Sequence, residues 1–113
     1  MNAKENTSTT IPFSIKKANT FSTRFKGLMF RKKPIDSEGL WIIPCNSIHM
    51  CFMNFPIDAV FLDKQERIVH LVPDLQPWRF VSPVKRAHSV IELPVGTIEQ
   101  MKLTNGQHLT FSC

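Results

Sequence analysis

The sequence predicts a mainly β protein, either a compact β-sandwich or a partly closed barrel, with two short helices. Two observations carry this prediction. From residue 39 onward, short runs of β-branched and aromatic residues alternate with breakers, and only two segments carry residues that begin or end a helix. Regular short strands of this kind are typical of sandwiches and barrels rather than of α/β sheets. The 113 residues correspond to the length of one domain.

The first residues differ from the rest of the chain. Residues 1–11 are mostly polar, and we expect a flexible tail because they cannot bury enough surface to offset the entropy lost on ordering. Residues 12–113 are then a single globular domain. Residues 12–18 alternate apolar and polar side chains, which is typical of a half-buried strand. Residues 19–27 run from a polar cap to a glycine and predict a helix of one to two turns.

Seven further strands are expected between the prolines and glycines of the remaining chain. They cover residues 40–43, 48–53, 58–62, 67–72, 78–81, 89–93 and 108–111. Residues 58–72 are the clearest unit and predict a hairpin with a four-residue loop at 63–66. Thr97 and Gln100 have the spacing of a capping box, which predicts a second short helix ending by Leu103.

The charge is unevenly distributed along the sequence. The formal net charge is +5, and residues 1–40 carry eight basic and three acidic residues, whereas residues 41–113 carry six of each. A basic region of this kind can attract nucleic acid, anionic lipid or an acidic partner, or it can be a solvated surface. With 42% hydrophobic and 20% charged residues, the composition excludes a disordered protein.

No segment is long and apolar enough to be a membrane span, and the first ten residues lack the apolar stretch of a secretory signal. We therefore expect a cytoplasmic protein. Three cysteines, an odd number, indicate reduced thiols rather than a disulfide framework.

The densest group of chemically versatile side chains lies in residues 45–53. If residues 48–53 are extended, His49, Cys51 and Met53 share one face of the strand. Such ligands suit zinc or copper(I), but the spacing matches no established metal motif, and a strand buried on both sides explains it equally. Cys51 with His49 can also be read as a nucleophile and base, although the apolar neighbours favour an inert thiol.

Two carboxylates lie within apolar runs. Asp58 begins a strongly apolar strand, and a buried carboxylate must be paired or must accept several hydrogen bonds. It is either a strand-entry residue that binds nearby backbone N–H groups or a ligand-fixing or acid–base group. Glu92 poses the same question, since strand alternation can also turn it to solvent.

Residues 78–80, Trp-Arg-Phe, can form an aromatic lip for a ligand or a base, or can cover the open end of a sandwich. Interleaved aromatic and arginine residues permit stacking of single-stranded nucleic acid. We disfavour that partner because the basic excess lies far upstream and no RNA-binding motif is present. The glycines form no phosphate-binding loop.

Several ordered motifs resemble the family called domain of unknown function 192, also known as uncharacterised protein family 0127. They are Gly-Leu-Met-Phe-Arg at 27–31, Gly-Leu at 39–40, Met53 with 55–63, Val-Ile-Glu-Leu-Pro at 90–94 with Gly96, and Asn-Gly at 105–106. Met-x-Phe-Pro-Ile-Asp at 53–58 and Pro-Trp-Arg at 77–79 are similar to one branch of that family. The resemblance implies a compact, mostly β fold and no established activity.

These observations favour a non-catalytic accessory domain whose open end accepts a small molecule or a partner segment. The residues expected there are Arg31, His49, Asp58 and Trp78. We expect no catalytic residue, no metal and no cofactor, and a monomer or weak dimer. The alternative is a metal- or thiol-dependent enzyme that uses Cys51, His49 and Asp58.

Overall fold

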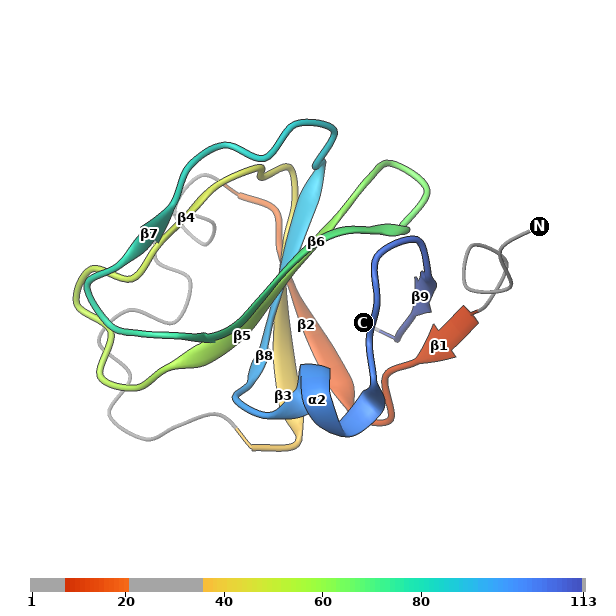
Figure 1. Ribbon diagram of the computed structural model, residues 1–113, viewed down its shortest axis with the longest axis horizontal. Helices are drawn as coiled ribbons and strands as arrows, with labels where there is room; N and C mark the ends of the chain where they lie inside the picture. Colours follow the sequence, from red (N-terminus) through yellow and green to blue (C-terminus); the bar gives the residue numbers. More distant parts are fainter. Residues whose placement is uncertain (1–7, 21–35, 113) are drawn as a thin grey trace.

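A computed structural model describes residues 8–20 and 36–112 (Figure 1). It is compact and mainly β, as predicted, and its sheets are not closed into a barrel. The predicted helix at residues 19–27 lies almost entirely outside the described residues. Of the helices in the described ranges, none is long and apolar enough to cross a membrane.

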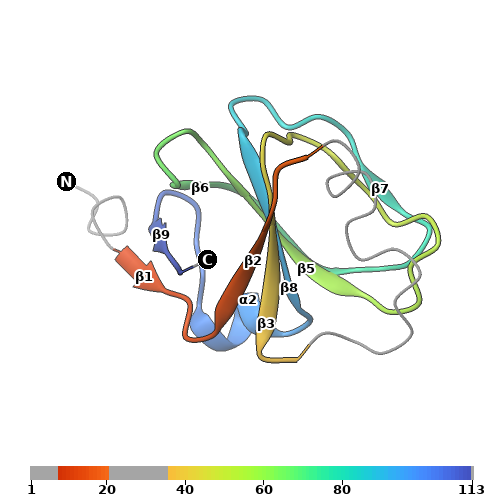
Figure 2. The ribbon, with the colours of Figure 1, turned by 180° about the vertical axis from the view of Figure 1, so that it is seen from behind.

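A five-stranded sheet forms the centre of the molecule (Figures 1 and 2). Its order is β2-β3-β8-β5-β6, with β2 parallel to β3 and every other pair antiparallel. The bounds are β2 Ser14–Ala18, β3 Glu38–Ile42, β5 Ile57–Leu62, β6 Ile68–Leu75 and β8 Ser89–Pro94. The central strands β5 and β8 are buried on both faces, which explains their almost unbroken apolar sequences.

Different parts of the chain cover the two faces of this sheet. One face packs against α2 (Thr97–Met101) and the pair β1 (Ser8–Thr10) and β9 (His108–Thr110). The other packs against residues 44–55 and 76–88, which we call the lobe. The lobe contains β4 (Ile48–His49) and β7 (Phe80–Val81). Figures 1 and 2 place the β4–β7 ribbon and the β1–β9 pair at opposite ends of the long axis.

Residues 8–10, which we expected within the flexible tail, form strand β1 instead. They pair in parallel with β9, and Thr10 Oγ1 lies 2.8 Å from Thr110 Oγ1. The Ile11 N–H donates to the Thr110 carbonyl at 2.9 Å, and the Ile11 side chain is buried in the core on this face. The β-branched side chains and the distant partner strand together order this segment, which composition alone could not indicate.

The hairpin formed by β5 and β6 is present as predicted, but its loop runs over residues 63–67, five residues rather than the predicted four. Asp63 Oδ1 accepts hydrogen bonds from the N–H groups of Gln65 at 2.8 Å and Arg67 at 3.0 Å. Strand β6 is an edge of the sheet, and irregularities in its register lie between Ile57 and Ala59 and between Phe61 and Leu62 of β5. Bulges and a proline on an edge strand reduce its tendency to pair with other chains.

The second predicted helix is present, but its predicted capping box is wrong. The N-cap is Gly96 with φ 96°, and the Thr97 hydroxyl donates to the Pro94 carbonyl at 2.7 Å rather than capping the helix. The Ile98 N–H is instead bound by Asp58, 40 residues earlier in the chain. A capping group supplied by another strand cannot be read from local spacing.

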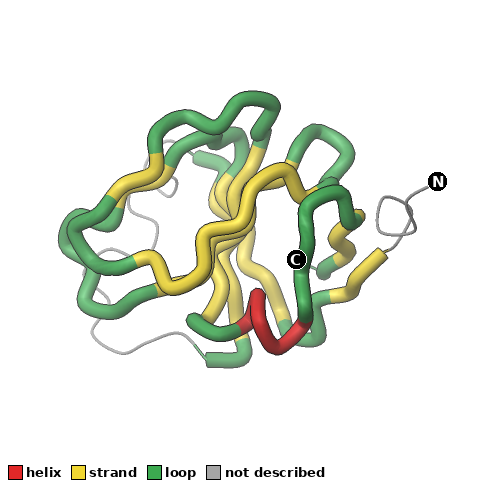
Figure 3. The backbone as a smooth tube through the Cα atoms, viewed as in Figure 1, coloured by secondary structure: helices red, strands yellow, loops and turns green. Residues whose placement is uncertain are grey.

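Figure 3 shows how much of the lobe is loop. The strand expected at residues 48–53 ends at His49, and a turn follows at residues 51–52. The predicted arrangement, with His49, Cys51 and Met53 on one strand face, is therefore wrong. The turn places Met50 and Met53 together in the core and turns Phe52 outward.

Candidate functional site

The ribbon of β4 and β7 fixes the backbone of the lobe. Beyond the two strands, the Met50 N–H donates to the Arg79 carbonyl at 2.7 Å, and the Trp78 N–H donates to the Met50 carbonyl at 2.8 Å. The Val84 N–H donates to the Asn46 carbonyl at 2.7 Å and ties the following loop to the first half of the lobe. Both halves therefore form one unit.

The inner side of the lobe is apolar and well packed. Ile48, Met50, Met53 and Phe55 are buried and join the core cluster on this face of the central sheet. Burying four large apolar side chains anchors the lobe to the sheet and holds its outer side in a defined position.

The outer side of the lobe exposes three aromatic rings. Phe52, Trp78 and Phe80 are 50%, 62% and 72% exposed, and they are three of the four exposed large hydrophobic residues in the part of the chain that the structure describes. The Phe52 and Trp78 rings meet edge to face, with centroids 5.1 Å apart and planes at 60°. A cluster of exposed rings is typical of an interaction surface, whereas a single exposed apolar residue is not.

Two of these three residues hold an unfavourable backbone conformation. Phe52 has φ 62° and Trp78 has φ 67°, in the left-handed region that bulky residues rarely adopt. Each costs about 1 to 3 kcal/mol relative to a relaxed backbone. The surrounding hydrogen bonds and the buried side of the lobe enforce this conformation, which brings the two rings together at the surface.

A groove of about 540 Å³ lies between β6 and residues 76–82, and of the three exposed rings Phe80 lines it. Its lining includes His70 and Asp74 from β6 and Arg79 and Phe80 from the lobe. The Asp74 carboxylate accepts a hydrogen bond from the Gln76 side-chain amide at 2.8 Å. The groove therefore offers an arginine and an aromatic ring on one side and mixed polar and apolar groups on the other.

The structure brings two of the four predicted ligand-binding residues into the lobe. His49 pairs with Phe80 across the β4–β7 ribbon, and Trp78 carries one of the exposed rings. Arg31 lies outside the described residues.

Asp58 lies on the opposite face of the central sheet. Its carboxylate is buried and accepts three backbone hydrogen bonds: Oδ1 from Asp74 at 2.9 Å, and Oδ2 from Gly96 at 3.1 Å and Ile98 at 2.8 Å. It thereby ties β5 to β6 and to the start of α2. Asp58 does bind backbone amides, but these belong to residues 16, 38 and 40 positions later in the chain rather than to nearby residues after the turn. The same geometry separates Asp58 from His49 and Trp78.

Glu92 is buried rather than turned to solvent. It lies on β8 opposite Leu40 and Ala59, so its side chain is on the lobe face of the sheet. Its Oε1 atom has no hydrogen-bond partner among the described residues. Burial raises the pKa of Glu92 from 4.5 to about 8, because the charged form is poorly solvated there. The carboxyl group is therefore protonated at neutral pH.

The cysteines show no arrangement for metal binding within the described residues. The Cys45 thiol donates to the Ser47 carbonyl at 2.8 Å, and Cys51 lies in the turn beside Phe52. Both cysteines are partly buried. Residues 8–20 and 36–112 contain no group of three or more histidine, cysteine or acidic side chains placed to hold an ion.

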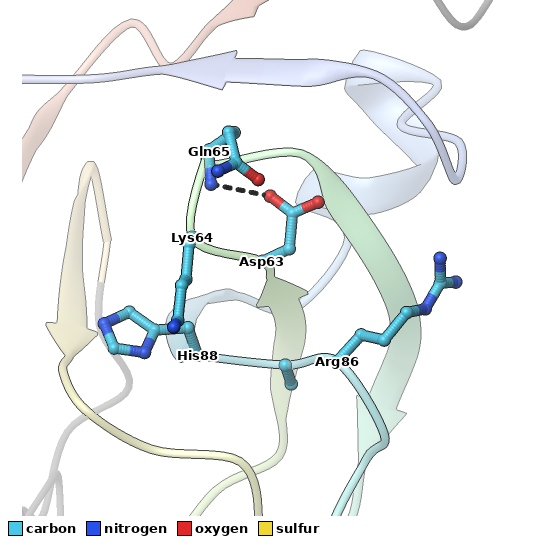
Figure 4. A pocket seen from close by; sticks show the side chains of 6 residues that line it. Asp63, Lys64, Gln65, Arg86 and His88 are labelled. Atoms are coloured by element: carbon cyan, nitrogen blue, oxygen red, sulfur yellow. Dashed lines mark hydrogen bonds between the residues drawn. The ribbon is translucent and has the colours of Figure 1, made fainter.

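A second hollow, of about 390 Å³, lies between the 63–67 loop and residues 86–88. Figure 4 shows that Lys64 lies beside His88, whereas the Arg86 side chain points away from both. The Asp63 carboxylate is engaged by the loop's own N–H groups. These basic groups do not converge on one point, so the hollow is a weaker site than the lobe.

Sequence reasoning did not single out Phe52 or Phe80 for the site. The sequence groups Phe52 with the apolar neighbours that are expected to bury the Cys51 thiol, and it predicts an extended strand through residue 53. Phe80 belongs to the aromatic lip predicted at residues 78–80, but only Trp78 of that segment is among the expected ligand-binding residues. The turn at residues 51–52 depends on backbone angles that are rare for phenylalanine, so no sequence signal could have indicated it.

The fold and the lobe define a class: a small, mainly β domain with an exposed aromatic surface. The family DUF192, described as "Uncharacterized ACR", matches residues 2–111, and the chain belongs to this family. The resemblance seen in the sequence motifs is therefore confirmed.

The chain is similar to archaeal proteins designated UPF0127. It is 34% identical over 103 residues to one from Thermococcus kodakarensis, covering 87% of this chain and 64% of that protein. It is 34% identical over 107 residues to one from Pyrococcus furiosus, covering 90% of each. A solved structure of a protein of unknown function from Novosphingobium aromaticivorans shares the fold, with a TM-score of 0.72, 24% identity and coverage of 83% of this chain and 71% of that one.

Proposed function

We propose that this chain is a non-catalytic accessory domain that binds a small ligand or a partner segment at the outer surface of the lobe. Trp78, Phe52 and Phe80 supply the contact surface, and Arg79 and His49 supply polar groups at its edges. Arg31 stays in the proposal as a further contact. We also propose a cytoplasmic location, in keeping with the odd number of cysteines.

The observation that carries this proposal is the paired Phe52 and Trp78 rings, exposed to solvent on a left-handed backbone. A ring turned to solvent contributes little to the core, and the backbone conformation costs stability. Features that lower stability and are nonetheless held firmly in place are concentrated at binding and catalytic sites.

The placement of Asp58 favours a binding role over the enzyme alternative. A catalytic set of Cys51, His49 and Asp58 needs the carboxylate within hydrogen-bonding distance of the imidazole. Asp58 lies on the other face of the sheet, and both of its oxygens already accept backbone hydrogen bonds.

The test is a ¹H–¹⁵N NMR titration with three small probes of different chemistry: adenosine monophosphate, N-acetylproline methyl ester and methyl glucoside. We expect at least one probe to shift the amides of Phe52 and of residues 78–81. The Trp78→Ala variant should lose these shifts while keeping its remaining spectrum. The Val95→Ala variant is the matched control, because Val95 is an exposed apolar residue outside the lobe. The absence of shifts at millimolar probe, or shifts centred on the hollow beside Asp63, would overturn the proposal.

A further inference from the structure

Basic and acidic residues are unevenly distributed between the lobe and the other described residues. The lobe contains three basic residues, Arg79, Lys85 and Arg86, and no acidic residue. The other described residues, 8–20, 36–43, 56–75 and 89–112, carry five basic and eight acidic residues. The lobe is therefore a positive region on a part of the molecule that is otherwise net negative, and it is electrostatically complementary to an anionic partner.

The positive charges and the aromatic rings lie in the same unit. Arg79 stands between Trp78 and Phe80 in the chain, and Arg79 and Phe80 both line the 540 Å³ groove along β6. Lys85 and Arg86 follow β7 in the loop that is hydrogen-bonded to residues 45 and 46, and Arg86 lines the hollow beside Asp63 and Lys64 rather than the groove. The acidic side chain that lines the groove, Asp74, accepts a hydrogen bond from the Gln76 amide.

We propose that the lobe binds single-stranded nucleic acid, with bases stacked on Trp78 and Phe80 and phosphates beside Arg79 and Lys85. This inference rests on the proposed function, because it names the ligand class for the same surface. Sites of this kind combine aromatic rings, on which bases of any sequence stack, with basic groups that follow the phosphate backbone.

The alternatives fit the lobe less well. An acidic peptide supplies negative charge but no regular series of flat faces for exposed rings. An anionic membrane favours a protruding apolar surface, whereas a groove with room for a planar group lies beside Phe80. The basic excess of residues 1–40 lies far from the Trp-Arg-Phe segment, but this segment does not depend on it. Residues 76–88 carry three basic and no acidic residues of their own.

The experiment measures fluorescence anisotropy of the full chain with 5′-fluorescein 12-mers of mixed sequence, as single-stranded RNA and as DNA, at 50 and 200 mM salt. We expect binding that weakens with salt, as phosphate contacts require. The Trp78→Ala and Phe80→Ala variants should each bind about five- to a hundredfold more weakly at either salt. The Arg79→Gln variant should reduce the salt dependence by about one phosphate contact. The Trp78→Phe variant should keep most of the affinity, because it keeps a ring.

The matched controls are Lys64→Gln, which removes one exposed positive charge outside the lobe, and Val95→Ala, which removes one exposed apolar side chain. Equal losses with Lys64→Gln and Arg79→Gln, or no loss with Trp78→Ala, would overturn the inference, because binding would then be general charge attraction.

Parallel arms use a poly-glutamate peptide and phosphatidylserine vesicles. Trp78-dependent binding to one of these, without binding to the 12-mers, would overturn the nucleic-acid inference and leave the lobe as the binding surface. Failure of the proposed function itself is seen separately in the NMR titration.

Discussion

The buried carboxylates on the two faces of the central sheet differ in how fully they are hydrogen-bonded. On the face covered by α2, the buried Asp58 carboxylate accepts three backbone hydrogen bonds. On the lobe face, the buried Glu92 has an oxygen without a partner among the described residues. The lobe also holds Phe52 and Trp78 on a left-handed backbone with their rings in solvent.

This difference indicates a division of roles. On the α2 face the Asp58 carboxylate is satisfied and the packing around Gly39 is close, although Trp41 Nε1 has no hydrogen-bond partner among the described residues and Lys102 has φ 54°. The lobe face departs from the rules that stabilise a fold at several positions, and such departures are retained where a surface has to do something other than stabilise the fold. The comparison therefore supports the proposal that one face chiefly supplies stability and the other binds, and the following substitutions test it.

The largest expected effect is the pH dependence that Glu92 imposes on stability. Its pKa is about 8 in the folded protein and 4.5 when unfolded, so the folded state keeps a proton that the unfolded state releases. The contribution of the protonated Glu92 to the free energy of unfolding is fully present below pH 4.5, declines between pH 4.5 and 8, and is lost above pH 8. The total change is about 3 to 5 kcal/mol. The Glu92→Gln variant should lack this decline in urea unfolding measured from pH 5 to 8. Parallel curves for the two proteins would contradict the assignment.

Removing the Asp58 carboxylate should be the next largest effect. The Asp58→Ala variant leaves three backbone N–H groups without their acceptor, and we expect the free energy of unfolding to fall by about 3 kcal/mol or more. The control is Asp63→Ala, whose carboxylate binds two N–H groups of the hairpin loop and should cost about 1 kcal/mol. Equal losses in the two variants would show that Asp58 does not tie β5 to α2.

The close packing of the α2 face is tested at Gly39. A Cβ there would lie 2.7 Å from Ile15 Cδ1, 2.9 Å from Leu93 Cδ2 and 3.1 Å from the Glu92 carbonyl. Because both side chains are buried, they cannot move away freely. We expect Gly39→Ala to lower the free energy of unfolding by about 1 to 3 kcal/mol in urea unfolding at pH 6. A stability equal to that of the unchanged protein would mean that this face is loosely packed.

The smallest effect should come from Phe52. The Phe52→Gly variant relieves the left-handed backbone and loses an edge-to-face ring contact, so its stability should stay within about 1 kcal/mol of the unchanged protein. The comparison is Phe55→Ala, which empties a buried site in the same lobe and should cost about 3 to 5 kcal/mol. Thermal unfolding of the pair measures the difference. A large loss with Phe52→Gly would show that its ring supports the fold.

The features that depend on nearby residues could be predicted from the sequence. The β5–β6 hairpin and the buried run of β8 follow from apolar and β-branched patterns within a few residues, and the mainly β class follows from their repetition. Strand β1 could not be predicted, because its partner β9 is almost 100 residues away. The same holds for the capping of α2 by Asp58, since the two are 40 residues apart.

The candidate site was partly predictable. Trp78 and His49 were identified as residue types suited to a ligand, and the fold places them both in the lobe. The exposure of Phe52 depends on a turn with an unfavourable φ, and local propensity argues against that turn. The positive charge of the lobe comes entirely from residues 76–88, which carry three basic and no acidic residues, because residues 44–55 contain no charged side chain.

The most direct test of the division of roles is to measure stability and binding on one variant, Trp78→Gly. Glycine adopts the left-handed backbone of this position without strain, so the variant removes the ring and relieves the backbone strain while keeping the local conformation. The account predicts a free energy of unfolding within about 1 kcal/mol of the unchanged protein, together with a more than tenfold loss of affinity for the single-stranded 12-mer. A stability loss of several kcal/mol with unchanged affinity would contradict the account, because the ring would then belong to the fold and not to the binding surface.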